Sequence, residues 1–95
     1  MEIQNKNDGK RGTFYIEDEV KEIALMHYIF PGPGKMIIDH TEVNHQYEGK
    51  GLGLQMVKAG VVYAREKQLK ILPLCPFAKK IFDITPAFAD VLFGS

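Results

Sequence analysis

The feature that most constrains this 95-residue chain is a glycine-rich loop at which the spacing of apolar residues changes. Residues 14–43 carry apolar side chains in runs typical of strands, and the loop Glu48-Gly49-Lys50-Gly51-Leu52-Gly53 follows. From residue 52 onward the apolar positions recur at helical spacing. A strand, a tight loop and a helix in this order favour a β-α-β crossover to a parallel strand.

Residues 14–43 are predicted to form an antiparallel meander. Strands are expected to begin at Phe14 and to cover residues 20–30 and 36–43, with the run Pro31-Gly32-Pro33-Gly34 as a turn. Apolar residues occur on both faces of 20–30. This pattern predicts an interior strand that is covered on both sides, at least in its second half.

The second half of the chain is predicted to be helix, strand and helix. A helix is expected over 52–68, and it should pack through one apolar stripe. The main positions of this stripe are Leu52, Met56, Ala59 and Tyr63, and Val57, Val61 and Ala64 widen it. Gly60 within this helix indicates close packing on the sheet. A strand follows over 70–75, and its Pro73 predicts an edge, a bulge or a splayed strand.

Pro76 suits the first turn of a helix over 77–84, and a last apolar segment covers 88–93. The expected fold is therefore α/β, an α+β mixed sheet with an antiparallel meander, one crossover and C-terminal helices. The length allows one domain, expected over 12–95, and the polar residues 1–11 are predicted to be a flexible tail.

Composition narrows the class of protein. The 12 Lys and Arg residues balance 12 Asp and Glu residues, which argues against nucleic acid as the main partner. The lone Cys75 cannot form an internal disulfide, and no apolar run resembles a leader or a membrane span. We therefore expect a cytoplasmic protein with no membrane partner. No His, Cys, Asp and Glu spacing suggests a metal site.

The glycine loop itself predicts an anion site. The first turn of a helix has unpaired N–H groups and a partial positive charge, and glycines let backbone approach a pyrophosphate closely. A dinucleotide fingerprint, G-x-G-x-x-G, is excluded because Leu54 stands at its sixth position, and no nucleotide P-loop run exists. Three alternate glycines exceed what an ordinary turn needs, while Lys50 either adds positive charge or faces solvent.

Several runs of this chain resemble the GNAT acetyltransferases, and in particular a small family of stand-alone GNAT domains. The resemblance covers residues 12–93 and is carried by I-D-H-T-E-V (38–43), G-K-G-L-G (49–53), Y-A-R-E (63–66), P-L-C-P-F (73–77) and P-A-F-A-D-V (86–91). The family's pyrophosphate pattern, [RQ]-x-x-G-x-G/A, is matched by Gln46, Gly49 and Gly51. In the alternative register, ending at Gly53, Glu48 replaces the Arg or Gln.

The resemblance implies an N-acetyltransferase that uses acetyl-CoA, which would insert between the splayed third and fourth of the strands expected above. It implies cofactor contacts at the strand end, the loop and the last helix, from Thr41, Glu42, Val43, Gly49, Lys50, Gly51, Leu52, Gly53, Lys79 and Phe82. The amine acceptor (a protein lysine, a polyamine or a small metabolite) would approach from the opposite face. A monomer or weak dimer is expected. The alternative function is a non-catalytic CoA-binding or protein-interaction module.

Cys75 is the first of two catalytic candidates. It follows a strand and precedes a Pro-started helix, where the helix N-terminus and Lys79 and Lys80 favour a reactive thiolate. If the sheet splays as the resemblance implies, this thiol would accept the acetyl group or protonate the departing CoA thiolate. The alternative is that Cys75 is a small buried hydrophobic residue.

His40 is the second candidate. An imidazole can take the proton that an amine must lose before it attacks a thioester. We expect His40 to share a strand face with Ile38 and Glu42. The alternative is an inert strand histidine. Asp39 and Glu42 are alternative bases or solvated strand residues, His27 and His45 rank below them, and the core is expected to hold Phe77, Phe82 and Phe88.

Overall fold

The computed structural model describes residues 2–19 and 21–94. Five strands form one sheet in the order β1-β2-β3-β4-β5, all antiparallel neighbours except the parallel pair β4–β5. The elements are β1 (Gln4–Asn7), β2 (Arg11–Asp18), β3 (Lys21–Gly32), β4 (Lys35–Val43), η1 (His45–Tyr47), α1 (Leu52–Lys67), β5 (Lys70–Pro73), α2 (Pro76–Ile84) and η2 (Pro86–Val91), where η marks a 3-10 helix. The predicted mixed sheet and its β4–α1–β5 crossover are confirmed.

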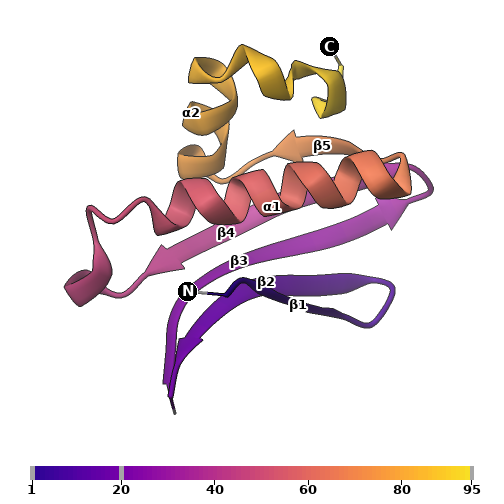
Figure 1. Ribbon diagram of the computed structural model, residues 1–95. Helices are drawn as coiled ribbons and strands as arrows, with labels where there is room; N and C mark the ends of the chain where they lie inside the picture. The colour runs from indigo at the N-terminus through magenta and orange to yellow at the C-terminus, as the bar shows by residue number, and fades with distance from the viewer. Residues whose placement is uncertain (1, 20, 95) are drawn as a thin grey trace.

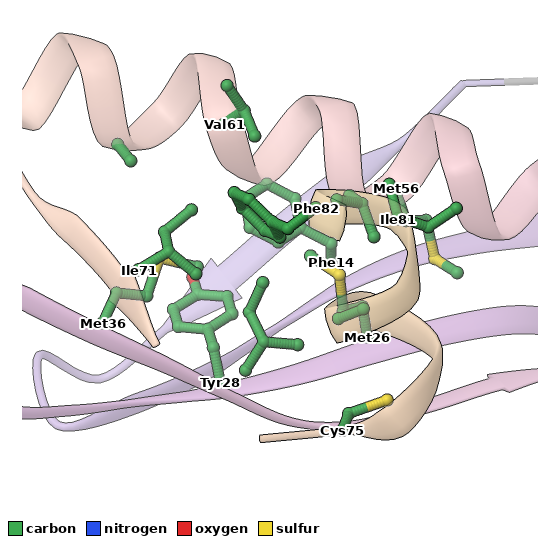
Figure 2. Close-up of a cluster of buried hydrophobic side chains, with 14 of the residues drawn as sticks. Phe14, Met26, Tyr28, Met36, Met56, Val61, Ile71, Cys75, Ile81 and Phe82 are labelled. Atoms are coloured by element: carbon green, nitrogen blue, oxygen red, sulfur yellow. The ribbon is translucent and has the colours of Figure 1, made fainter. Parts of the chain in front are cut away.

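Helix α1 lies along one face of the sheet and covers the hydrophobic core, while α2 stands beside β5 (Figure 1). Figure 2 shows Phe14, Met26 and Tyr28 lying beneath α1. A Cβ at Gly60 would lie 3.1 Å from Met26 Cε, so the predicted close packing is confirmed. The buried stripe is centred on Gly60, and Tyr63, which we had placed in the main stripe, lies half-buried at its margin.

The opposite face of the sheet is called here the open face. In β3 the side chains of Ala24, Met26 and Tyr28 are buried against α1, whereas Leu25 and Ile29 on the open face are only half-buried. Ile23, near the start of β3, is buried, whereas the second half of β3, for which cover on both sides is predicted, has a half-buried open face, so the prediction is wrong there. Val20 lies outside the described residues.

Residues 1–11, expected to be a flexible tail, contain strand β1. The buried ring of Tyr28 reaches across Gly12, where a Cβ would lie 2.6 Å from Tyr28 Cζ. Its hydroxyl accepts a hydrogen bond from Asn7 Nδ2 at 3.2 Å and donates one to Asn5 Oδ1, so the core holds β1 through polar contacts. All four residues of β1 are exposed, which is why no apolar alternation predicted this strand.

The C-terminal segment returns to the sheet after α2. Pro76 is the first residue of α2, as predicted. η2 is tied to α1 by Arg65, whose Nη2 donates to Asp90 Oδ1 and to the Ala87 carbonyl, both at 2.8 Å. The amide of Phe93 then donates to the Ile71 carbonyl of β5 at 2.8 Å. These bonds fix the position of α2 beside β5.

Candidate functional site

β4 and β5 separate partway along the sheet. The ladder between them ends with the pair Ile38 and Pro73. The amides of Leu74 and Cys75 both donate to the Ile38 carbonyl, at 2.9 and 3.1 Å, and the chain then turns into α2. Because β4 continues to Val43, its last five residues have no β5 partner within the described ranges 2–19 and 21–94. The predicted splay at Pro73 is confirmed.

The glycine loop is shaped by two left-handed residues. Gly49 has φ +80° and Gly51 has φ +75°, values that L side chains rarely adopt. Gly51 is the N-cap of α1 and offers no side-chain cap; the Gln55 amide, at 3.0 Å from the Gly51 carbonyl, makes the first helical bond. The amides of the first helical turn therefore have neither an acceptor within the helix nor a side-chain cap from Gly51.

At Gly53 the requirement for glycine is steric and does not come from the backbone φ angle. It is buried in the first turn of α1, and a Cβ there would lie 2.6 Å from Phe77 Cε2 on α2. The missing side chain lets the Phe77 ring lie against the start of α1. Phe77 is nevertheless 41% exposed, which leaves part of the ring available to a ligand.

A groove of about 460 Å³ joins the splay to the glycine loop, and it is called here the splay groove. Its walls come from the end of β4, η1, the glycine loop, the start of α1 and α2, with lining residues Thr41, Val43, Tyr47, Glu48, Gly49, Gly51, Leu52, Gly53, Leu54, Phe77 and Ile81. The groove therefore has an apolar wall, a free strand edge and a positively polarised helix end.

Tyr47 fixes the outer end of the splay groove. Its hydroxyl donates to Asp18 Oδ2 at 2.8 Å, and this bond to a carboxylate raises the pKa of the phenol. Asn44 caps η1 by accepting from the Gln46 amide at 2.9 Å. The Asn44 amide donates to the Ile23 carbonyl of β3 at 2.7 Å, so the segment before the glycine loop is held to both β2 and β3.

Cys75 lies at the base of the splay, as the N-cap of α2, and only 6% of it is exposed. Its Sγ donates to Thr41 Oγ1 at 3.3 Å. In Figure 2 it stands at the start of α2, apart from the aromatic side chains of the core. Thr41 lines the splay groove and Cys75 does not, so the thiol stands directly behind a groove-lining hydroxyl.

His40 lies on the other side of β4 from Cys75. It pairs with His27 across β3, and Glu42 pairs with Leu25, so both project onto the open face. The expectation that His40 shares a face with Ile38 is wrong, because a bulge at Asp39 reverses the alternation after Ile38. His40 Nε2 is 3.4 Å from Glu42 Oε1 and its side chain is 57% exposed.

Glu42 lines a second hollow, of about 450 Å³, where β3 begins and β4 ends. It shares Val43 with the splay groove but includes the open-face residues Leu25 and Glu42. The side chain of Glu42 therefore points away from the splay groove, and only its backbone could make the cofactor contact that the sequence analysis expected.

The two phenylalanines of α2 have different roles from those that the sequence analysis predicted. Phe82 is buried and packs against Phe88 at a ring distance of 5.9 Å, whereas Phe77, expected in the core, lines the splay groove. Lys79 is exposed and pairs with Asp83 at 3.0 Å. The prediction of Phe77 in the core is wrong because Gly53 lets its ring lie at the start of α1, a contact between two helices that the sequence does not indicate.

Lys50 is exposed at the tip of the glycine loop. Within the described part of the chain, no three or more His, Cys, Asp or Glu side chains are grouped so that they could hold a metal ion. Of the helices that the structure describes, none has the length and apolar character needed to cross a membrane.

Three comparisons identify the family. The family model for the GCN5-related N-acetyl-transferases matches residues 13–91. Protein NATD1 from Gallus gallus is 28% identical over 85 residues, which are 88% of this chain and 77% of the chicken protein. The solution structure of a GCN5-like protein from Staphylococcus aureus is similar with a TM-score of 0.77 and 36% identity, over 99% of this chain and 89% of that one.

A ribosomal-protein-alanine N-acetyltransferase from Brucella melitensis biovar Abortus 2308 has the same fold. Its TM-score is 0.67 at 17% identity, over 80% of this chain and 61% of that one, so this likeness concerns the fold alone. The splayed β4–β5 pair, the glycine loop and the match over residues 13–91 agree with one another. The chain therefore belongs to the GCN5-related N-acetyltransferase family.

Proposed function

We propose that this protein is an acetyl-CoA-dependent N-acetyltransferase that binds CoA in the splay groove. The observation that carries the proposal is the continuity of this groove. It runs from the end of β4, which has no β5 partner in the described part of the chain, to the first-turn amides of α1. A long ligand with an amide-bearing arm and a pyrophosphate needs this order of features.

The residues of the groove fit the two chemically different parts of CoA. The backbone of Thr41, Glu42 and Val43 offers strand hydrogen bonds to the amides of a pantetheine arm, and Phe77 and Ile81 offer apolar contact on its other side. The amides that follow Gly49 and Gly51 would hold the pyrophosphate, since both glycines turn the backbone without placing a side chain there.

Lys50 would add charge near the pyrophosphate from the exposed tip of the loop. Lys79 would add a second cation from α2, although its ammonium group is shared with Asp83. Phe82 would support the site from within the core, where it packs from α2 against Phe88, and Phe77 would make the direct aromatic contact with the ligand.

Bound acetyl-CoA supplies an acetyl group activated as a thioester. We infer that Cys75 donates a proton toward the departing sulfur, through the Thr41 hydroxyl that its Sγ already contacts at 3.3 Å. A thiol that is 6% exposed and hydrogen-bonded as a donor suits this role better than that of a nucleophile. The amine would approach from the open face. His40, which the sequence analysis selected as proton acceptor, also lies there, but its ring is 57% exposed and its Nε2 faces Glu42 at 3.4 Å, so it is assigned no role in the transfer.

The test of the proposed function is CoA release in the presence of acetyl-CoA and a panel of amines that includes polyamines, lysine peptides and small primary amines. Calorimetric titration with CoA is run beside it. Tight binding with amine-dependent CoA release supports an enzyme. Binding without release for every amine would instead favour the non-catalytic CoA-binding module, and no binding would overturn both functions.

A further inference from the structure

The open face carries a histidine–carboxylate pair that the motif analysis ranked low. His27 Nδ1 lies 2.8 Å from Asp39 Oδ1. The two side chains are 29% and 32% exposed, so both are about two-thirds buried although they lie on the uncovered side of the sheet. Such a short contact between partly buried groups fixes the orientation of the imidazole.

The backbone explains why these residues meet. Across β3 and β4, His27 pairs with His40 and Tyr28 pairs with Ile38, which leaves Asp39 as the extra residue of a bulge. Asp39 directly follows Ile38, whose carbonyl receives the last bonds from the β5 side. Asp39 therefore borders the start of the splay on the open face, opposite the Cys75–Thr41 contact, and holds His27 of β3 beside it.

The hydrogen bond also determines which nitrogen of His27 can accept a proton. An ionised carboxylate is only an acceptor, so Nδ1 must carry the donated hydrogen and Nε2 of the neutral ring keeps a free lone pair. His40 differs, because its Nε2 is the nitrogen nearest to Glu42 and its side chain is 57% exposed. His45 Nδ1 also contacts a carboxylate, Glu48 Oε1 at 3.1 Å, but its side chain is 96% exposed. Among the residues that the structure describes, His27 alone combines a partly buried, held ring with an Nε2 that contacts no carboxylate.

We propose that His27 accepts the proton of the incoming amine and that Asp39 is the residue that positions it, an inference that rests on the proposed acetyltransferase function. The amine nitrogen forms its bond to the acetyl carbon while its proton passes to His27 Nε2. The bond from that carbon to sulfur breaks, and the sulfur takes a proton from the Cys75 side. The transfer leaves His27 protonated and Cys75 deprotonated, and both groups return to their starting states by exchanging one proton with solvent before the next turnover.

Several charged side chains lie near His27, and they must be considered in any pH-dependent test of its role. On the β2 side, His27 lines a shallow hollow of about 330 Å³ with Lys6, Asp8 and Arg11, and Asp8 is engaged by the amides of Lys10 and Arg11 at 2.9 Å. On the β4 side it faces Asp39 and His40. A pH–rate profile of His27 must therefore be compared with that of a His40 variant.

The first experiment needs no activity. Long-range ¹H–¹⁵N NMR of the imidazole rings at pH 8 should show His27 with its hydrogen on Nδ1, and Asp39→Asn should abolish that preference. A hydrogen on Nε2 in the wild-type protein would overturn the inference, because that nitrogen could not then accept a proton.

The second experiment uses an amine that supports CoA release. His27→Gln should lower kcat by about 10²-fold or more, remove the acidic limb of the pH–rate profile and leave the KM for acetyl-CoA within about twofold. His40→Gln is the matched control and should retain that limb. Asp39→Asn should lower kcat with an unchanged KM for acetyl-CoA, and His27→Asn replaces the Gln variant if that one fails to fold.

The outcomes separate this inference from the proposed function. Retained turnover and an unchanged acidic limb in His27→Gln would overturn the role of His27 while the acetyltransferase stands. Loss of the limb in His40→Gln alone would return the role to His40. Absence of CoA release from the wild-type protein with every amine would overturn the proposed function and this inference together.

Discussion

Replacing Gly51 by valine should weaken CoA binding by about tenfold while the domain stays folded. Gly51 has φ +75°, and a β-branched residue in that region costs about 1–2 kcal/mol. A Cβ at this position meets nothing within 4 Å, so backbone strain is the whole cost. A valine loop relaxes to another conformation, and the ligand must restore the original one. Since 1.4 kcal/mol is a factor of ten in affinity, the expected loss is about 5–30-fold.

Isothermal titration of CoA into the folded variant measures this loss. Gly34→Val is the matched control, because Gly34 has φ +73°, also meets nothing within 4 Å, and lies in the turn before β4, at the opposite end of that strand from the loop. It should show a similar loss of stability and wild-type CoA affinity. Wild-type affinity in a folded Gly51→Val protein would refute the reasoning, since the amides after Gly51 would then hold no phosphate.

Three further predictions test the rest of the structure. Gly60→Val should lower the unfolding free energy by about 1–3 kcal/mol, because the new side chain meets Met26 Cε at the helix–sheet contact; thermal unfolding measures it, and an unchanged Tm would contradict it. Cys75→Ala should lower kcat without changing CoA affinity, and mass spectrometry after acetyl-CoA incubation should find no acetyl adduct on the wild-type protein, whereas an adduct on Cys75 would replace the proton-donor role with a covalent one. The Arg65 hydrogen bond lowers the pKa of Asp90, so the pair stabilises the fold above about pH 4 and its contribution is lost as pH falls through the lowered pKa; Asp90→Asn should remove that part of the Tm–pH curve, and an identical curve would contradict it.

The sequence predicted those helices and strand ends that depend on the spacing of apolar residues or on proline. The change of period at the glycine loop placed α1 within one residue of its observed end, and Pro76 marked the start of α2. Pro73 predicted an edge, a bulge or a splayed strand, because a residue without an N–H group interrupts a ladder, and the ladder does end at its pair with Ile38. Each of these signals depends on residues that are close in the sequence, so it can be interpreted without knowledge of the tertiary contacts.

What the sequence could not supply depends on contacts between distant residues. β1 is polar throughout and is held by the hydroxyl of Tyr28, a residue 21 positions beyond Asn7. The bulge at Asp39 moves His40 to the open face, and no residue type in β4 announces a one-residue insertion. Phe77 lies in the groove because Gly53 admits its ring, a relation between two helices that spacing within either one does not contain.

The central claim is that one ligand spans the splay and the glycine loop, and a ¹H–¹⁵N NMR titration of the labelled protein with acetyl-CoA tests it most directly. The claim predicts saturable shifts of backbone amides in two segments, Thr41–Val43 and Gly49–Leu54, at a common dissociation constant. The amide of Gly34, at the far end of β4, should stay unchanged. Shifts confined to the open-face hollow beside Glu22, or no shift in the glycine loop at saturation, would contradict the claim.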